Sequence, residues 1–537
     1  MKKRPNVIIF NPDEMRLDAL HHMGLNAAAL TPNLDAFASS DAVSFSNAFC
    51  QNPVCVPSRC SMFTGLYPHV NGHRTMSYLL REGEASLFSE LKESGYYVWM
   101  NSRNDLISGN REGLFESHAT EVFYGGNVPP SPGRKKKREY SAKKYFSSQF
   151  GGELEVDGNG LNYSPDDEDV DALCERIMNR KSDKPFFGFV GLMYPHCPYQ
   201  VEEPYYSATD RSELPERIRW EDCSGKSRMI ETIRNNIGLS DMTEDDWREL
   251  RAVYAGMCMK VDAEFGRVID ALKKSGEYDD TLIIFVSDHG DFAGDYGLPE
   301  KAQNTFEDCL VRVPFLVKPP KSAGAADAGI SSSIVELVDL YATVHDYCGT
   351  EPVHTHFGRS LRPVLENRET VIRDFAICEG GRLPSESHCN EFLQSAGPGV
   401  PTSPSSPYYP RHLAQTDDRA HAKALMIRTL SEKYVSRISG EDEYYDLVND
   451  PQEKHNLILD NEVREKVIRL QQMALRHLLA TSDIVPFDRD NRFTQRMVWE
   501  KVKSMVPEGQ EEKIRDMIRH GANRFMLVEY LKRGEKQ

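Results

Sequence analysis

Short apolar runs alternate with stretches of helical periodicity over the first two thirds of the chain. The runs read as buried strands, and the clearest lie at 7–10, 97–100, 186–190, 282–286 and 313–317. Helical patterns lie between them, at 31–38, 57–63, 87–94 and 247–275. Apolar strands that alternate with helices are typical of a mainly parallel sheet covered on both faces. The sequence therefore predicts an α/β fold with a large mixed, mainly parallel sheet sandwiched by helices.

The length of 537 residues exceeds what one ordinary domain holds. We expect a catalytic α/β domain at 1–365, a smaller C-terminal α+β domain with an antiparallel sheet at 366–484, and a helical tail at 485–537. Strand patterns at 433–438 and 443–447 indicate the smaller sheet.

Two segments rich in Gly, Pro or Ser interrupt this pattern, at 108–165 and 381–412. A loop as long as the second often serves as a lid or binding loop in a compact protein, and we predict that role for it. The first carries the basic run 134–138, which we expect to be a solvated loop, as most such runs are.

Charge and cysteine content narrow the classes of partner. The formal net charge of −17 argues against nucleic acid and against an anionic membrane surface, and no apolar run approaches the roughly 20 residues of a spanning helix. The basic N-terminus is followed by four apolar residues, too few for the apolar region of a signal peptide. Eleven scattered cysteines favour a reducing compartment. We therefore expect a cytoplasmic protein whose anionic ligands, if any, need local positive charge.

Four of the predicted strands are each followed by titratable side chains. In chain order these are Asp13 and Glu14, Arg103 and Asp105, His196, and Asp288 and His289. Ligands of open α/β sheets bind outside the carboxyl ends of the strands. Any one of these segments could be an ordinary solvated loop, but together they predict one shared site.

The acidic members of this group suggest a metal site. Carboxylate oxygens of Asp13, Glu14 and Asp288 with the imidazole of His289 suit a hard or borderline divalent cation. Ca²⁺ is the ion that we expect, and Mn²⁺ and Mg²⁺ stay open. The chain lacks the Cys-x-x-Cys and His-x-x-x-His spacings of a thiolate-rich zinc site.

The segment around Cys55 predicts a reactive position. Pro57 suits a first helical turn and Gly65 suits the residue past a helix end, so a short helix begins just after Cys55. The positive end of such a helix binds tetrahedral anions and lowers a thiol pKa. Arg59, one turn in, could fork onto an oxyanion. Alternatively Cys55 is an ordinary buried cysteine; thiol phosphatases separate Cys and Arg by five residues, whereas three intervene here.

Cys55-Val56-Pro57-Ser58-Arg59, followed by Thr64-Gly65, resembles the Cys/Ser-x-Pro-Ser-Arg pattern of the type I sulfatase family in the alkaline phosphatase superfamily. The resemblance covers most of the chain. Further matching segments are 31–35, 65–69, 287–290, 312–314, 445–447 and 449–451.

This resemblance implies that a maturation enzyme oxidises Cys55 to formylglycine, whose hydrated aldehyde supplies the nucleophile. It also implies roles for the surrounding residues. Asp13, Asp288, His289 and residue 55 would hold the metal, Arg59 would stabilise the nucleophile, His196 would bind sulfate or protonate the leaving oxygen, and Lys301 would grip a sulfate oxygen.

Four positions depart from the commonest family pattern. Arg103 stands in place of lysine, and Asp105 in place of a histidine, where it would contact the alcohol portion of the substrate. Glu14 stands where Asp or Gln is usual. His289 replaces asparagine and resembles the choline sulfatase and phosphonate monoester hydrolase branches.

The leading hypothesis is hydrolysis of a sulfate monoester to an alcohol and sulfate. Two alternatives stay open: a phosphonate monoester or phosphodiester hydrolase with the same nucleophile, and a binding protein in which Cys55 is unmodified. The alcohol could belong to a sugar, an aryl or a small alkyl sulfate. A homo-oligomer is possible, and we expect no nucleic-acid or membrane partner.

Overall fold

The computed structural model describes residues 4–25, 28–133, 150–239, 242–394, 408–485, 487 and 492–534. The chain divides into two compact units, Met1–Ile484 and Val485–Gln537. The basic run 134–138 lies outside the described residues, as does the stretch 395–407 of the second Gly/Pro-rich segment. The expected boundary between residues 365 and 366 stays a prediction.

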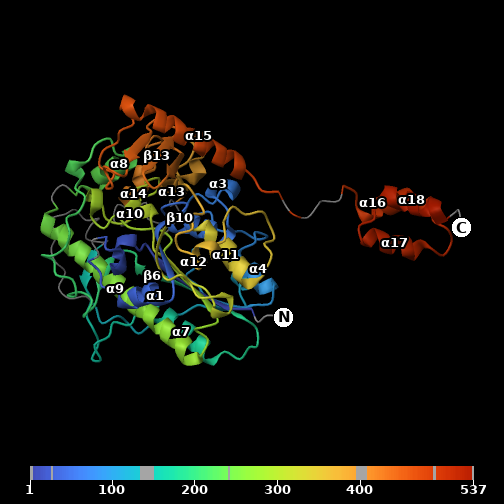
Figure 1. Cartoon of the computed structure of the whole chain (residues 1–537), viewed down its shortest axis with the longest axis horizontal. Coiled ribbons are helices and arrows are strands. Elements are labelled where there is room, and N and C mark those ends of the chain that lie inside the picture. Colours follow the sequence, from blue (N-terminus) through green and yellow to red (C-terminus); the bar gives the residue numbers. More distant parts are fainter. Residues whose placement is uncertain are drawn as a thin grey trace. The chain divides into compact units, whose positions relative to one another are not determined.

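An eight-stranded sheet forms the centre of the larger unit (Figure 1). β1 pairs in parallel with β6 and β8, whereas β9 runs antiparallel to β2 and β8. The predicted mixed, mainly parallel sheet is therefore confirmed. Its strands in spatial order are β10 (Gly329–Glu336), β2 (Val43–Phe49), β9 (Phe315–Lys318), β8 (Thr281–Val286), β1 (Asn6–Asp13), β6 (Phe186–Pro195), β3 (Tyr97–Asn101) and β4 (Glu121–Phe123).

Aromatic side chains show how helices cover both faces of this sheet. Phe10 of β1 packs against Phe265 of the helix α9 (Glu244–Ser275). Phe189 of β6 packs on the other face, against Phe63 of α2 (Cys55–Thr64) and Phe88 of α4 (Leu87–Glu93). The two faces differ because Phe189 is in register with Ile9, and neighbouring residues of a strand point to opposite sides.

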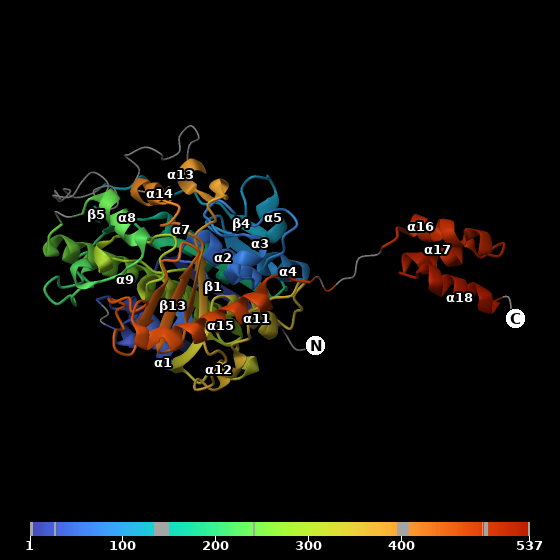
Figure 2. The same cartoon turned by 90° about the horizontal axis from the view of Figure 1, so that it is seen from above.

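The other helices of the larger unit extend these two layers and their connections (Figure 2). They are α1 (Pro32–Ser40), α3 (Pro68–Asn71), α5 (Leu114–His118), α7 (Pro165–Asn179), α8 (Arg228–Ile237), α10 (Asp308–Val311), α11 (Val338–Cys348), α12 (Arg362–Glu366), α13 (Glu391–Gln394), α14 (Tyr409–Ala414) and α15 (Arg464–Thr481). No helix in the described part of the chain is long and apolar enough to cross a membrane.

Three strands of the large sheet were missed by the sequence pattern: β2, β10 and the three-residue edge strand β4. β2 carries Ser44, Ser46 and Asn47 among its apolar residues, and β10 carries three consecutive serines. Neither strand therefore presents a continuous apolar run. The strand expected at 313–317 begins two residues later, at Phe315, because Val313 and Pro314 precede the ladder that pairs β9 with β8.

A separate antiparallel sheet near the C-terminus confirms the predicted smaller sheet. Its order is β11 (Ala376–Gly380), β12 (Ala424–Arg428), β13 (Glu432–Arg437) and β14 (Glu443–Asp446). The Glu379 amide donates a hydrogen bond to the Gln51 carbonyl, so this sheet lies directly beside the segment that leads into α2. A further small sheet pairs β5 (Phe150–Glu153) with β7 (Tyr199–Val201).

The unit Val485–Gln537 contains three helices, α16 (Gln495–Val502), α17 (Glu511–Arg519) and α18 (Arg524–Gly534). They bury a small apolar core of their own, which includes Val502, Ile514 and Leu527.

Candidate active site

The carboxyl ends of β1, β3, β6 and β8 meet at one edge of the sheet, where a cavity of about 520 Å³ opens. Six of the side chains predicted from the sequence line this cavity: Asp13, Cys55, Arg103, Asp105, His196 and Lys301. The two Gly/Pro-rich segments differ in whether their described residues line this cavity. Described residues of 381–412 line the cavity, whereas none of the described residues of 108–165 does.

Four buried side chains form a cluster with the chemistry of a metal site: Asp13, Cys55, Asp288 and His289. One ligand atom from each lies within 4.8 Å of all the others. Cys55 Sγ is 3.1 Å from His289 Nε2 and 3.4 Å from Asp13 Oδ1. His289 Nδ1 donates to the Gly290 carbonyl at 2.9 Å, which leaves Nε2 free to act as a ligand. Two carboxylates and one imidazole fit a divalent cation.

Arg59 binds the carboxylates of this cluster. Its Nε lies 2.8 Å from Asp288 Oδ2, and its Nη2 lies 3.0 Å from Asp13 Oδ2. All three side chains are fully buried. The expected fork onto an oxyanion is not what the structure shows, because the guanidinium is already committed to two carboxylates. Arg59 therefore positions Asp13 and Asp288 and does not line the cavity.

Cys55 begins α2, and Gly65 ends that helix with φ of 69°, so the helix predicted from Pro57 and Gly65 is present. Burial raises the pKa of the Cys55 thiol well above its ordinary value, and Asp13 raises it further. The prediction of an acidified thiol is therefore wrong. The helix end carries only about half a positive charge, which desolvation and a full carboxylate charge outweigh.

Glu14, Lys301 and His196 form a second group beside the cluster. Lys301 Nζ lies 2.9 Å from Glu14 Oε2, and His196 Nε2 lies 3.5 Å from the same oxygen. Glu14 has a φ of 69°, which turns its side chain from Asp13 toward Lys301. Glu14 Oε1 is buried with no hydrogen-bond partner among the described residues. Such an orphaned oxygen beside Asp13 fits a nearby cation, and the assignment of Glu14 as a ligand stays a prediction.

Arg103 and Asp105 lie at the mouth of the cavity. Arg103 Nη2 binds Asp13 Oδ2 at 2.8 Å, and its Nε donates to the Leu192 carbonyl at 3.0 Å. Asp105 keeps 32% of its side chain exposed and lies 3.8 Å from Arg59 Nη1. Its φ of 45° turns the chain sharply after β3. Arg103 therefore supplies positive charge at the cavity, and Asp105 supplies a solvent-accessible acceptor.

Sequence reasoning did not single out the opposite side of the cavity, which we name the α13–α14 wall. It consists of Glu391, Tyr408, Arg411 and His412. Arg411 Nη1 lies 2.6 Å from Glu300 Oε1, and Glu300 in turn lies 3.5 Å from Lys301. The one signal in the sequence was the length of the 381–412 segment, because none of these residues belongs to a motif.

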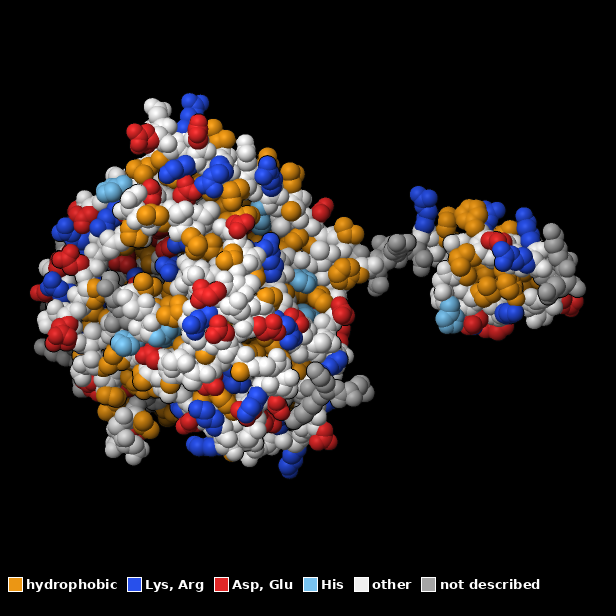
Figure 3. Space-filling view, in the orientation of Figure 1, with side chains coloured by type: hydrophobic (Ala, Val, Ile, Leu, Met, Phe, Trp, Pro, Cys, Tyr) orange, Lys and Arg blue, Asp and Glu red, His pale blue; other side chains and the backbone are white. Residues whose placement is uncertain are grey.

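Three cationic side chains meet at this cavity, which also carries the carboxylates of Asp13, Asp105 and Glu391. On the face seen in Figure 3, acidic and basic side chains are interspersed over the larger unit. Arg103, Lys301 and Arg411 instead converge on one cavity, which can focus an anion within an acidic protein.

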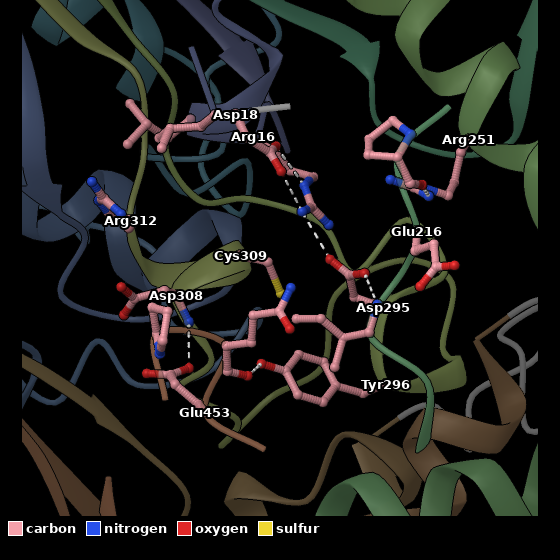
Figure 4. Close-up of a pocket in the computed structure, with 16 residues that line it drawn as sticks. Arg16, Asp18, Glu216, Arg251, Asp295, Tyr296, Asp308, Cys309, Arg312 and Glu453 are labelled. Carbon is pink, nitrogen blue, oxygen red and sulfur yellow. Dashed lines mark hydrogen bonds and ion pairs between the residues drawn. The ribbon is translucent and has the colours of Figure 1, made fainter. Parts of the chain in front are cut away.

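A second cavity, of about 340 Å³, lies near the other side of the loop that follows β8 (Figure 4). Several of its charged side chains are already paired, either within the cavity or with residues outside it. Arg16 binds Asp18 and Asp295, and Asp308 binds Arg428 and Lys433 outside the cavity. None of the site residues predicted from the sequence lines it, so we place the chemistry in the first cavity.

A covered mixed sheet with an acidic metal cluster and converging cations at its strand ends defines a hydrolase of the alkaline phosphatase superfamily. Within that class the sulfatase family model matches residues 5–350. The chain belongs to the sulfatase family.

Individual relatives of the chain are consistent with its membership of the sulfatase family. The chain is 24% identical over 509 residues to an arylsulfatase of Clostridium perfringens, which covers 88% of this chain and 94% of that protein. It is 27% identical over 397 residues to a choline-sulfatase of Rhizobium meliloti, covering 70% and 74% of the two chains. The structure of a phosphonate monoester hydrolase of Agrobacterium radiobacter matches with a TM-score of 0.67 at 22% identity, covering 90% and 97%. That structural likeness shows the fold.

Proposed function

We propose that this sulfatase-family hydrolase cleaves a sulfate monoester to an alcohol and sulfate with a nucleophile formed from Cys55. The observation that carries the proposal is the position of Cys55. Its Sγ lies within 3.4 Å of Asp13 and His289 at the start of α2, and it lines the cavity that Arg103 and Lys301 also line. An oxidising maturation enzyme would convert Cys55 to formylglycine. One hydroxyl of the hydrated aldehyde would attack sulfur as the bond from sulfur to the alcohol oxygen breaks, and the second hydroxyl would then expel sulfate and restore the aldehyde.

Asp13, Asp288, His289 and residue 55 would hold one divalent cation. Ca²⁺ is our first choice because oxygen ligands dominate, and Mn²⁺ and Mg²⁺ stay open. A bound cation supplies Lewis acidity, which lowers the pKa of an oxygen ligand and neutralises developing negative charge. Arg59 positions Asp13 and Asp288 for this role.

Lys301 and Arg103 would bind the sulfate oxygens. Burial alone would lower the pKa of Lys301, but the nearby Cys55 and Glu14 raise it well above its ordinary value, so Lys301 stays charged. Arg103 uses Nη2 for Asp13 and Nε for the Leu192 carbonyl, and it can offer its remaining N–H groups to a tetrahedral anion. Both donors stabilise negative charge as it moves toward the departing oxygen.

His196 would serve the leaving oxygen. Its Nδ1 lies 2.6 Å from the Cys197 carbonyl, so Nδ1 carries a proton and Nε2 points to the cavity side near Glu14. Burial and Lys301 lower its pKa well below the ordinary value, so the free protein holds His196 neutral. An anionic substrate beside it would favour the imidazolium form, which can donate from Nε2.

A phosphonate monoester or phosphodiester hydrolase is the second candidate. The structural match to a phosphonate monoester hydrolase and the histidine at position 289 favour it. Both reactions use a tetrahedral anion and the same nucleophile, so the residues of the cluster serve either one.

A paired turnover assay separates the two candidates. Protein whose Cys55 conversion has been established by peptide mass is assayed with an aryl sulfate and with the matching aryl phosphonate monoester. We expect kcat/KM to be higher for the sulfate. A clearly higher value for the phosphonate would move the protein to the second candidate and withdraw the sulfate-binding role of Arg103.

We also propose that the protein resides in a reducing compartment. All eleven cysteines lie among the described residues, and each is a free thiol, which supports a reducing compartment such as the cytoplasm. A maturation enzyme for Cys55 would then have to act in the same compartment. Homo-oligomer formation stays a prediction.

A further inference from the structure

The α13–α14 wall holds two buried nitrogen atoms for which the described residues supply no partner. Arg411 and His412 are 7% and 8% exposed, and both line the cavity. Arg411 Nε and His412 Nδ1 are each buried without a hydrogen-bond partner among the described residues. A buried polar atom left unpaired costs about 1–3 kcal/mol, so a cavity that carries two of them fits a ligand that satisfies them.

The two atoms differ in hydrogen-bonding character. Arg411 Nε is always a donor. Burial and Arg411 lower the pKa of His412 to about 4, so its ring is neutral at neutral pH. His412 Nε2 lies 3.7 Å from Glu391 Oε2 and therefore faces a carboxylate with its proton, which leaves Nδ1 as an acceptor. A donor beside an acceptor suits a hydroxyl group, which both accepts and donates.

The charges around the wall disfavour a second negative group on the alcohol. Arg411, the cation of the wall itself, is already paired with Glu300 at 2.6 Å, whereas Lys301 and Arg103 are assigned to the sulfate group. Burial would raise the pKa of Glu391, but Arg411 and His412 hold it below its ordinary value, so Glu391 is anionic. A carboxylate placed here would meet that charge and the lone pair of His412 Nδ1.

The wall also offers an aromatic surface next to the reacting group. The Tyr408 ring centroid lies 6.5 Å from that of His196, so the wall adjoins the leaving-oxygen side of the site. Arg411 lies over the same ring, with Cζ 4.9 Å from its centroid. The cavity volume of about 520 Å³ lies within the range of small-molecule sites and exceeds what a sulfate group alone needs.

We infer that the α13–α14 wall is a subsite for a neutral, polyhydroxylated alcohol, so that the substrate is a sulfated sugar without a carboxylate at this position. Arg411 Nε donates to one hydroxyl oxygen, His412 Nδ1 accepts from a hydroxyl proton, and Tyr408 packs against the apolar face of the ring. The inference rests on the proposed sulfatase function. A plain aryl sulfate would fill the space but leave both nitrogens unpaired.

The test compares two substrates in variants of the wall. The kcat/KM values for a hexose 6-sulfate and for 4-nitrophenyl sulfate are measured on full-length protein with confirmed Cys55 conversion. In Arg411→Met and His412→Phe we expect the ratio of hexose sulfate to aryl sulfate to fall by about 10- to 100-fold from its wild-type value, the cost of one lost hydrogen bond to a charged or buried partner.

Two further variants distinguish recognition from support of the fold. Arg411→Lys keeps a charge for Glu300 but has no Nε donor, so we expect the same fall in the ratio. Arg419→Met is the matched control, since that side chain is 61% exposed and pairs with Glu441 away from the cavity; its ratio should equal the wild-type ratio.

The possible outcomes distinguish failure of the proposed subsite from failure of the proposed sulfatase function. An unchanged ratio in Arg411→Met and His412→Phe, or recovery in Arg411→Lys of a ratio lost in Arg411→Met, would overturn the subsite. So would a wild-type protein that cleaves aryl sulfate and no hexose sulfate, although the proposed function would then stand. Absence of turnover on both sulfates would overturn the proposed function and this inference with it.

Discussion

Buried polar side chains are paired to different extents in the metal-site cluster and in the α13–α14 wall. In the cluster, Asp13 and Asp288 are fully buried and both are neutralised by Arg59. In the α13–α14 wall, Arg411 and His412 are nearly as buried, yet each keeps a nitrogen with no hydrogen-bond partner in the described part of the chain.

The difference follows from what each part must do. The cluster has to hold a cation and a nucleophile in one geometry, so its own ion pairs fix the carboxylates before any ligand arrives. The wall has to discriminate between alcohols, and unpaired atoms penalise every alcohol that cannot reach them. Chemistry therefore depends on the cluster, and substrate choice depends on the wall.

The largest expected effect is on the nucleophile. Cys55→Ala removes the only atom that the proposed reaction uses for attack, so we expect kcat to fall by about 10⁴-fold or more on every sulfate tested. Steady-state assays on purified variant and wild type measure this loss. A variant that retains wild-type turnover would contradict the mechanism, and unequal losses on sugar and aryl sulfates would contradict the division between cluster and wall.

Substitution of Arg59 tests how much the ion pairs of the cluster contribute to the stability of the protein. Arg59→Met leaves Asp13 and Asp288 buried without this counter-ion, which should lower the free energy of unfolding by about 3–5 kcal/mol. Denaturation with urea measures the change. Arg103→Met is the control, because Arg103 is 25% exposed and contacts Asp13 alone among these two carboxylates, and we expect a smaller loss. Equal losses would show that burial at Arg59 is not decisive.

The sequence predicted the cluster better than the wall for a physical reason. Asp13 and Asp288 follow continuous apolar strands, and Cys55 and Arg59 lie in a short motif, so local sequence identifies them. Arg411 and His412 lie in a Pro- and Ser-rich segment and read as surface residues. Their burial results from tertiary packing around Glu300 and Glu391, residues more than 100 and about 20 positions away in the chain.

The strands of the fold, too, could be predicted only where the local sequence shows a clear pattern. The central strands β1, β6 and β8 are continuously apolar because both of their faces are covered, and all three were found from the sequence. The edge strand β10 carries three consecutive serines, of which Ser332 is exposed and the other two are buried, and β2 mixes polar and apolar residues, so neither shows a pattern that distinguishes it from a loop. The direction of β9 depends on its pairing with β8, which no local pattern encodes.

Cation binding should stabilise the cluster without involving the wall. Addition of Ca²⁺ at a hundredfold excess over its Kd should raise the free energy of unfolding by about 2.7 kcal/mol, and a chelator should reverse this. Thermal unfolding with Ca²⁺, Mn²⁺ or Mg²⁺ measures the effect and ranks the ions. Asp288→Asn should weaken the response, whereas His412→Gln should keep it. A response that Asp288→Asn leaves unchanged would place the cation elsewhere.

The smallest expected effect concerns acid and the buried His412 of the wall. The pKa of His412 is lowered to about 4 in the folded protein, whereas an unfolded histidine titrates near 6.5. Below pH 6.5 the unfolded chain therefore binds a proton that the folded chain refuses, and the stability from neutral His412 is lost as the pH falls toward 4. Asp13 stays ionised over this range, because Arg59 and its neighbours outweigh burial and hold its pKa far below the ordinary value.

Urea denaturation at pH 7.0 and pH 5.5 measures this contribution. We expect His412→Gln to lose about 1 kcal/mol less stability than the wild type between the two pH values, since one histidine contributes close to that amount over the interval. His455→Gln is the matched control, because it makes the same substitution at an exposed histidine outside the wall. If the two variants respond to acid alike, His412 is not held neutral in the folded protein, and the wall loses the acceptor assigned to it.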